Sequence, residues 1–251
     1  MLTQARGRLM TTPLTRAPRL CMVAAMPRTA PLPEITPEII LRAYSIGLFP
    51  MAESADDDRL FWLDPEERGI FPLDGLIVSR SLAKTVRAEP FEVTVDEDFD
   101  AVIGACADAS PERPSTWINA EIRRLYRALF ERGNAHTVEC RKDGALVGGL
   151  YGVSIGGAFF GESMFHRATD ASKIALVHLV ARLRAGGFSL LDAQIVTPHL
   201  ARLGAVRAPR ATYRQMVGRA VAHPADFHAA PRRLSGAQAL ALARGIAAPP
   251  A

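Results

Sequence analysis

The stretch Ala145–Gln194 decides the fold of this chain. Its first part, Ala145–Lys173, reads ALVGGLYGVSIGGAFFGESMFHRATDASK, and its last part, Ser189–Gln194, reads SLLDAQ. No charged residue lies in Ala145–Gly161, and Glu162 then ends the uncharged run. A carboxylate beside so apolar a segment is costly unless it is paired or used. Glu162 is therefore either an edge-strand residue that reaches solvent or a functional group.

We predict three antiparallel strands here, at Thr137–Arg141, Ala145–Ser154 and Ala158–Phe165. The turns Lys142-Asp143-Gly144 and Gly156-Gly157 are typical hairpin connections between them. The uncharged run is shorter than the ~20 residues of a membrane helix and contains six glycines. It is not a phosphate loop either, because it leads into a strand and no Gly-Lys-Ser/Thr follows.

After the third strand the apolar period changes to that of a helix. Two apolar rows predict a helix that is buried on most sides, capped by Asp170 or Ser172 and running to Ala185, where Gly186-Gly187 follows. Phe188–Thr197 then reads as a strand. Its residues Asp192 and Gln194 share one face at period two, which indicates either a site or a satisfied internal hydrogen-bond pair.

Composition limits the classes of protein to which the chain can belong. At 251 residues it forms one large domain or two small ones. Its cysteines, Cys21, Cys106 and Cys140, are odd in number and form no C-x-x-C motif, and the six histidines include no H-E-x-x-H pair. This pattern indicates a reducing, cytoplasmic setting without a zinc site, so we expect no metal and no cofactor.

The net charge of +4 comes from the N-terminal end. Residues 1–33 hold five arginines and no acid, and the rest of the chain holds 25 basic against 26 acidic side chains. Any nucleic-acid surface must then be a local patch. We expect residues 1–33 to be a disordered tail, although the composition also resembles a transit peptide, and Met10, Met22 and Met26 are alternative starts.

Further helices and strands are predicted along the chain. Thr36-Pro37-Glu38 begins a helix that runs to about Ile46. Leu76–Val78 reads as a short strand. Ser79–Arg87 then predicts a helix on which Arg80, Lys84 and Arg87 form one basic stripe, either a solvated face or a contact surface. Next we expect a strand at Phe91–Val95, a helix capped by Asp96 and a helix capped by Asn119.

Eight fragments now carry a resemblance, in chain order. They are Ala43-Tyr44…Gly47-Leu48-Phe49-Pro50, Ser79-Arg80-Ser81, Thr116-Trp117-Ile118, Gly148-Gly149-Leu150-Tyr151-Gly152, Gly161-Glu162-Ser163-Met164-Phe165, Ala171-Ser172-Lys173, Leu191-Asp192-Ala193-Gln194 and Leu203-Gly204-Ala205. Each is weak alone, but the ordered set resembles the bacterial leucyl/phenylalanyl-tRNA–protein transferases over about Thr36 to Phe227.

The resemblance implies an α+β protein with a small N-terminal domain and a larger domain of the GCN5-like N-acyltransferase type, with a mainly antiparallel sheet. We expect a tail at residues 1–33, the small domain at 34–72, the catalytic domain at 73–232 and a C-terminal tail at 233–251. The implied enzyme is a cytoplasmic monomer that needs no membrane. It moves Leu or Phe, with Met as a further candidate, from aminoacyl-tRNA to the N-terminal Arg or Lys of a protein, which is then degraded.

The resemblance also implies roles for individual residues. Asp192 orients Gln194, whose amide oxygen receives the incoming amine, and Glu162 contacts polar groups of the substrate. An apolar pocket selects the aminoacyl group; its residues are Leu150, Met164, Leu176, Leu179, Leu183 and Leu191. The terminal adenosine stacks on Trp117 and Met51, and the stripe of Arg80, Lys84 and Arg87 contacts tRNA. From their residue types alone, the pocket residues could equally well be core residues, and Trp117 could be an ordinary packed side chain.

Two positions depart from the family pattern. Some members have Trp in place of Met51, and some have Asn-Asp in place of Thr197-Pro198. Two other functions remain open. One is an acyl-CoA-dependent N-acetyltransferase, although His166–Lys173 lacks the glycine-rich turn that such enzymes place at a helix N-terminus. The other is a non-catalytic tRNA-binding module, which would not require Asp192 and Gln194 together beside an apolar pocket.

Overall fold

The computed structural model describes residues 34–57, 59–109 and 115–246. The expected tail at residues 1–33 lies outside them. Two sheets are present in the described part: a two-stranded one and a seven-stranded one with the order β4-β5-β6-β7-β8-β3-β9. The helices are α1 (Pro37–Ser45), α2 (Arg80–Ala88), α3 (Phe99–Ala107), α4 (Ala120–Glu131), α5 (Ala171–Ala185), α6 (Pro198–Arg202), α7 (Arg210–Val221) and α8 (Gly236–Ala243). None of these helices is long and apolar enough to cross a membrane.

The predicted double hairpin forms the centre of the large sheet. Strands β5 (Ala135–Lys142), β6 (Ala145–Ile155) and β7 (Ala158–His166) pair antiparallel in sequence order, and β4 (Glu92–Val95) extends them at one edge. After β7 the chain crosses through α5 and returns as β8 (Leu190–Gln194), which pairs parallel to β7. The sheet is therefore mixed but mainly antiparallel, as expected for an α+β protein.

The small sheet and α1 form a separate N-terminal element. Strand β1 (Phe49–Met51) pairs with β2 (Phe61–Leu63), and α1 begins at Thr36, whose hydroxyl caps the backbone of Ile39. The next strand, β3 (Glu67–Phe71), lies in the large sheet between β8 and β9 (Val206–Pro209). Thus residues within the range expected for the small domain contribute a strand to the larger sheet.

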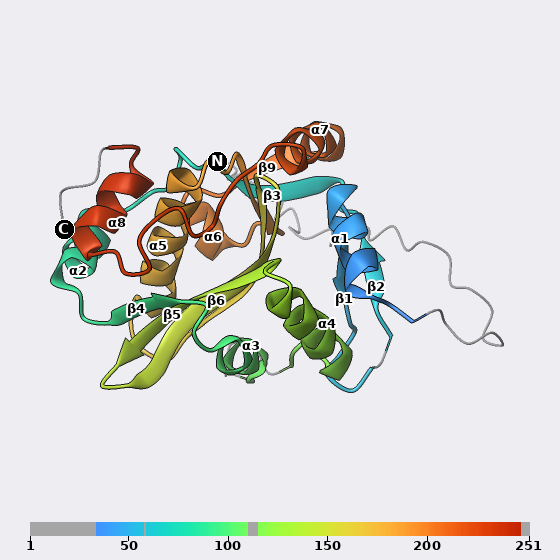
Figure 1. The fold of residues 1–251 in the computed structure, drawn as a ribbon, viewed down its shortest axis with the longest axis horizontal. Coiled ribbons are helices and arrows are strands. Elements are labelled where there is room, and N and C mark those ends of the chain that lie inside the picture. Colours follow the sequence, from blue (N-terminus) through green and yellow to red (C-terminus); the bar gives the residue numbers. More distant parts are fainter. Residues whose placement is uncertain (1–33, 58, 110–114, 247–251) are drawn as a thin grey trace, which may run out of the picture.

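Helices cover both faces of the large sheet (Figure 1). One hydrophobic cluster joins the sheet to α2, α5 and α8, and a second joins its other face to α1, α3, α4 and α7. Adjacent residues of the central strands alternate between the clusters: Leu150 and Phe159 face the first, and Tyr151 and Phe160 face the second. This alternation is the period-two pattern of a sheet covered on both faces.

Two glycines of β6 allow other parts of the chain to pack closely against this strand. A Cβ at Gly148 would lie 2.4 Å from the Cβ of Ala171, at the first turn of α5. At Gly152, where the β6–β7 register shifts, a Cβ would lie 2.4 Å from the carbonyl oxygen of Phe160. These glycines let a helix and a neighbouring strand approach closely.

Several sequence expectations are wrong in detail. Leu76–Val78 is not a strand, and Ile77 donates only an isolated backbone bond to Leu203. The strand expected at Phe188–Thr197 ends at Gln194, where φ is +57° and the ladder stops. Asp98, not Asp96, caps α3.

The end of the chain also differs from the simple tail that we expected after residue 232. Ser235 caps α8, whose residues Ala239 and Leu240 are buried in the first cluster. Its alanine-rich sequence therefore packs against α5 and α2, as Figure 1 shows, and is part of the core.

Candidate active site

The carboxylate of Glu162 lies in a cluster with two buried tyrosines. Glu162 is on β7, just after the uncharged run, and is partly exposed. Its Oε1 accepts a hydrogen bond from the hydroxyl of Tyr44 on α1, and its Oε2 accepts one of 3.1 Å from Tyr126 on α4. The two hydroxyls are 2.5 Å apart. Three elements that are far apart in the sequence thus meet at one carboxylate.

A count of protons explains the chemistry of this cluster. Three contacts join the three side chains, but the two tyrosine hydroxyls supply only two protons. A protonated Glu162 would supply the third. Burial raises the pKa of Glu162 to about 7, assisted by the charge of Asp192 and opposed by the tyrosine hydrogen bonds and Arg68. The cluster can therefore hold or release one proton near neutral pH.

Gln194 joins this cluster from the end of β8. Its side-chain Nε2 donates to Oε1 of Glu162 at 2.8 Å, which sets the orientation of the amide. Its backbone has left-handed geometry, with φ of +57°, a conformation uncommon for a side chain of this size. Among the described residues its amide oxygen has no hydrogen-bond partner. That oxygen is an acceptor available to a substrate.

Asp192 lies behind Gln194 and is completely buried. Its Oδ1 accepts the backbone N–H of Gln194 at 2.7 Å, and its Oδ2 accepts the hydroxyl of Tyr213 on α7 at 2.7 Å. The guanidinium of Arg68 on β3 adds a two-pronged ion pair, with Nη2 at 2.6 Å from Oδ2. Asp192 thus positions Gln194 through its backbone.

Arg68 is the least expected member of the site, because its guanidinium is buried with only 1 % of the residue exposed. Burial alone would lower its pKa, but the charge and hydrogen bonds of Asp192 raise it, so Arg68 stays charged. The guanidinium lies 4.2 Å from the ring centroid of Phe49 and 4.8 Å from that of Tyr213. It also donates to the carbonyl of Gly47 at 3.3 Å. Arg68 therefore ties the N-terminal element to β8 and α7.

Five of the six predicted pocket residues belong to the first hydrophobic cluster, and the sixth packs against it. Leu150 and Met164 face each other across β6 and β7, and Leu191 is on β8. Leu176, Leu179 and Leu183 come from α5. All are buried in the cluster except Met164, which is partly exposed and packs against it. They thus share the space between the sheet and α5, while their role as a pocket stays a prediction.

The predicted adenosine residues border the second cluster. Met51 on β1 and Trp117, before α4, are both partly buried and pack against it. Each can therefore present part of its side chain to solvent. Their shared role in holding the adenosine stays a prediction.

The predicted tRNA stripe is fully formed on α2. Ser79 caps the helix, Leu82, Ala83 and Val86 are buried, and the opposite face carries Arg80, Lys84 and Arg87. These three cations are exposed and form no ion pair with any described residue. In Figure 1, α2 lies beside α8, at the opposite end of the view from α1. The stripe thus lies away from α1, which contributes Tyr44 to the Glu162 cluster.

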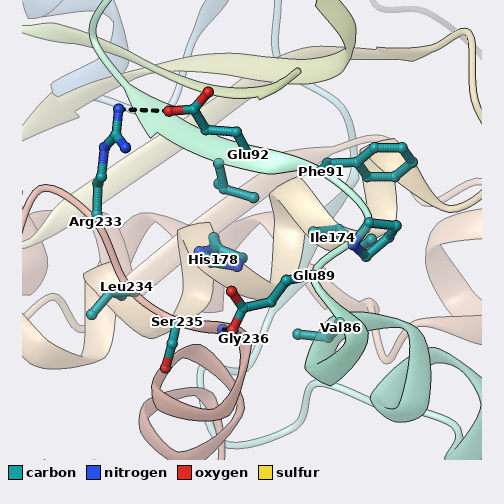
Figure 2. Close-up of a pocket in the computed structure, with 12 residues that line it drawn as sticks. Val86, Glu89, Phe91, Glu92, Ile174, His178, Arg233, Leu234, Ser235 and Gly236 are labelled. Atoms are coloured by element: carbon teal, nitrogen blue, oxygen red, sulfur yellow. Dashed lines mark hydrogen bonds and ion pairs between the residues drawn. The ribbon is translucent and has the colours of Figure 1, made fainter. Parts of the chain in front are cut away.

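A separate pocket of about 480 Å³ lies between α2, β4, α5 and the start of α8 (Figure 2). His178 on α5 faces it, and burial lowers the pKa of His178 to about 4, so its imidazole is neutral. Glu89 accepts the backbone N–H of Gly236 at 2.7 Å, and Arg233 pairs with Glu92. None of the predicted site residues lines this pocket.

Sequence reasoning missed four residues of the site: Arg68, Tyr44, Tyr126 and Tyr213. Tyr44 and Tyr126 lie on the apolar faces of α1 and α4. The hydroxyl of a buried tyrosine normally needs a hydrogen-bond partner. That signal could have marked them as polar groups that need one. No local signal could have paired Arg68 with Asp192, because 124 residues separate them.

The site therefore presents an unpaired amide oxygen beside a carboxyl group with a pKa of about 7. Such a pair suits a reaction in which an attacking amine or hydroxyl must lose a proton. Among the described residues, the polar groups joined by hydrogen bonds at this site are carboxylates, tyrosine hydroxyls, an amide and one guanidinium, without a thiol or an imidazole.

Comparisons with known proteins agree with this chemistry. The family model described as leucyl/phenylalanyl-tRNA protein transferase matches residues 70–218, and the model of that family's N-terminal domain matches residues 33–66. Proteins named leucyl/phenylalanyl-tRNA–protein transferase are similar to most of the chain. The one from Afipia carboxidovorans is 58 % identical over 217 residues, which cover 86 % of this chain and 96 % of that protein. One from Rhodopseudomonas palustris is 57 % identical over 83 % of this chain and 94 % of its own length.

Proposed function

The chain belongs to the leucyl/phenylalanyl-tRNA–protein transferase family, and from this premise we propose how its site performs the transfer. The enzyme moves a leucyl or phenylalanyl group from aminoacyl-tRNA to an acceptor protein. The acceptor is the N-terminal amine of a protein that begins with Arg or Lys. The large domain is of the GCN5-like N-acyltransferase type, and the enzyme acts as a monomer in the cytoplasm, where charged tRNA is found.

The donor ester is already activated, so the reaction needs little covalent help. The α-amine attacks the ester carbonyl, a C–N bond forms, and the C–O bond to the terminal ribose breaks. The amine loses one proton and the ribose oxygen gains one. An α-amine has a pKa of about 7.7–8.0, so a useful fraction is neutral near pH 7. Positioning of the two reactants can then supply much of the rate.

The amide oxygen of Gln194 is the observation that carries this proposal. It has no partner among the described residues, whereas the amide nitrogen is fixed on Glu162 and the backbone on Asp192. In the proposed complex this oxygen accepts a hydrogen bond from the attacking amine and directs its lone pair towards the ester. Since Gln194 is held at both ends, little entropy is lost when the amine binds.

Glu162 takes part in the transfer as the ionisable group that is hydrogen-bonded to the side chain of Gln194. With a pKa of about 7, its carboxylate can exchange a proton with an amine of similar pKa. Its negative charge also suits an acceptor whose N-terminal residue is Arg or Lys. Tyr44 and Tyr126 hold the carboxylate in place through their hydroxyls.

The donor end is assigned to the remaining predicted residues. The leucines between α5 and the sheet, together with Met164, receive the apolar side chain. Trp117 holds the terminal adenine by stacking, which does not depend on the identity of the base. Met51 adds a thioether contact. The exposed stripe on α2 contacts phosphates of the tRNA. These three roles follow from the family resemblance and from the burial of each residue.

The direct test is to supply leucyl-tRNA and a peptide that begins with Arg, and to weigh the peptide. We expect a mass increase of one leucyl residue. A matched peptide with an acetylated N-terminus should gain nothing, because its amine is blocked. Transfer to the acetylated peptide, or no transfer to the free one, would contradict the proposed reaction.

A further inference from the structure

Two histidines and an aspartate meet at a point that the transfer reaction does not use. Asp96 follows β4, His136 lies on β5, and His228 lies in the segment between α7 and α8. The Oδ2 of Asp96 lies 2.8 Å from Nδ1 of His136 and 3.3 Å from Nε2 of His228. The three donor atoms all lie within 4.8 Å of one another.

Two of these three side chains are already held by further hydrogen bonds. The Oδ1 of Asp96 accepts the backbone N–H of Thr137 at 2.7 Å, which leaves Oδ2 for the histidines. The other nitrogen of His136, Nε2, lies 3.1 Å from the hydroxyl of Ser154. Metal-binding histidines and carboxylates normally have such outer partners, which fix the ring and the tautomer. Asp96 reaches this position with φ of +57°, a conformation that costs free energy.

The third residue, His228, belongs to a segment that is docked on the same edge of the sheet. Phe227 is buried and stacks on the ring of His136, with 4.0 Å between ring centroids. The backbone N–H of His228 donates to Asp226 at 2.8 Å, so the local chain is fixed. The buried Arg182 donates to backbone carbonyls just beyond, including that of Pro231 at 2.7 Å. The His228 side chain itself is 55 % exposed, so a solvent ion can reach it.

We propose that Asp96, His136 and His228 bind one zinc ion, which fastens the segment between α7 and α8 to the edge of the sheet formed by β4 and β5. Two imidazole nitrogens and one carboxylate oxygen are a donor set that Zn²⁺ accepts, with a fourth position left for water. Mg²⁺ and Ca²⁺ prefer sites made of oxygen alone. This site departs from our sequence expectation, which considered only closely spaced motifs.

The observed spacing suits such an ion. With bonds of about 2.0–2.2 Å, tetrahedral zinc holds its donor atoms about 3.3 Å apart. Of the two separations from Asp96, the one of 3.3 Å matches this value and the one of 2.8 Å is slightly shorter, and the exposed ring of His228 can rotate to adjust the third.

The proton positions are also compatible with both states. Without metal, Nδ1–H of His136 donates to Asp96, and Nε2 accepts from Ser154. With metal, Nδ1 binds the ion and Nε2–H donates to Ser154. A serine hydroxyl can serve either as donor or as acceptor, so every buried group keeps a partner when the ion binds.

The test uses the untagged full-length enzyme after treatment with EDTA. Zinc is added, the free chelator is removed, and bound metal is counted, while thermal melting is followed against the zinc concentration. We expect one ion per chain and a melting temperature that rises with zinc, because an ion that binds only the folded state stabilises it. Cobalt in place of zinc should give the visible absorption of a tetrahedral N/O site.

Matched variants separate this site from unspecific binding. His228→Ala removes an exposed donor, so the protein should fold, but stoichiometric zinc and the visible cobalt band should be lost. Ser154→Ala should weaken zinc by about 10- to 100-fold, as outer partners of metal sites do. His223→Ala, an exposed histidine of the same segment, should bind like the wild type.

Three outcomes would overturn the proposal. They are a wild-type enzyme that binds no stoichiometric zinc, a His228→Ala variant that binds it equally well, and a His223→Ala variant that loses it to the same extent as His228→Ala.

Discussion

At the scale of the residue, Gln194 gathers the contacts that matter for transfer. Its amide nitrogen is fixed on Glu162, its backbone N–H on Asp192, and its amide oxygen is left for a substrate. A left-handed backbone at the end of β8 brings these contacts together. Strain of this kind persists only where the surroundings hold it, and here the buried Asp192 does so.

Replacing Gln194 by Ala should lower turnover strongly, by about 10²-fold or more, because the amine loses the acceptor that positions it. Binding of charged tRNA should stay close to the wild-type value, since no donor contact is assigned to Gln194. Single-turnover transfer to an Arg peptide measures the first quantity, and filter binding measures the second. Wild-type turnover in the variant would refute the assigned role.

Replacing Asp192 by Asn should act mainly on stability. The variant leaves the charge of Arg68 buried without its partner, and breaking a buried pair in this way typically costs about 3–5 kcal/mol. Urea unfolding measures the loss. Asp143→Asn is a matched control on the exposed turn between β5 and β6, where a surface change should stay within about 0.5 kcal/mol. Equal stabilities of the two variants would mean that the Arg68 pair contributes little.

The raised pKa of Glu162 predicts a pH-dependent stability. The pKa of Glu162 is about 7 in the folded state and about 4.5 in the unfolded state, so the folded protein binds this proton more tightly than the unfolded chain does. The stabilisation is complete below about pH 4.5 and is lost as the pH rises through about 7. Glu162→Gln removes this titration and is otherwise nearly isosteric. The free energy of unfolding of the wild type, relative to the variant, should therefore fall across this range, and a flat difference would show that Glu162 titrates normally.

At the scale of the element, one face of α2 packs into the core and the other carries exposed positive charges. Leu82, Ala83 and Val86 are buried, whereas Arg80, Lys84 and Arg87 are exposed without an ion pair to another described residue. Two arginines of α7 differ from this stripe, because Arg210 and Arg214 pair with Asp64. The charge of the α2 stripe is therefore free for phosphates, whereas Arg210 and Arg214 are paired with an acid.

Alanine at all three stripe positions should weaken tRNA binding equally for every donor amino acid. The slope of log affinity against log salt should flatten by about 0.7–0.9 for each phosphate contact that is lost. Alanine favours helix, so α2 should remain folded. Lys142→Ala, an exposed cation at the β5–β6 hairpin, is the matched control and should leave the slope unchanged. An unchanged slope in the triple variant would mean that the stripe is simply solvated.

At the scale of the whole molecule, the N-terminal element and the large sheet share the site. Tyr44 comes from α1, Glu162 from β7 and Arg68 from β3, so the cluster assembles only when these parts pack together. On the opposite face of the sheet from this cluster, α8 packs directly against α5. The site is thus a product of the folded chain as a unit.

A chain that starts at Pro33 should retain full transfer activity. Residues 1–33 lie outside the described residues, and their sequence has no helix caps and no apolar period. Transfer from leucyl-tRNA to an Arg peptide, compared at equal enzyme concentration, measures the effect. A large loss of activity would instead show that the five arginines of this segment bind tRNA.

The sequence by itself determined the elements whose signals are local. The turns after Lys142 and Ile155 predicted the hairpins of β5, β6 and β7, and the caps of two helices were predicted at Thr36 and Asn119. Such signals act within a few residues, so pattern and propensity suffice. The ordered set of eight fragments, which includes those around Glu162 and Asp192, also indicated the family before any contact was known.

Only the tertiary structure decided which side chains meet. Arg68 and Asp192 are 124 residues apart, and Tyr44 and Glu162 are 118 apart. Pairings of this kind depend on the order of strands and on the packing of helices, and they leave no periodic trace in the sequence. The same reason explains the position of β3 between β8 and β9, the docking of α8, and the meeting of Asp96 with two histidines. Burial by distant segments then set the raised pKa of Glu162, because the solvent that it lost was removed by residues from other parts of the chain.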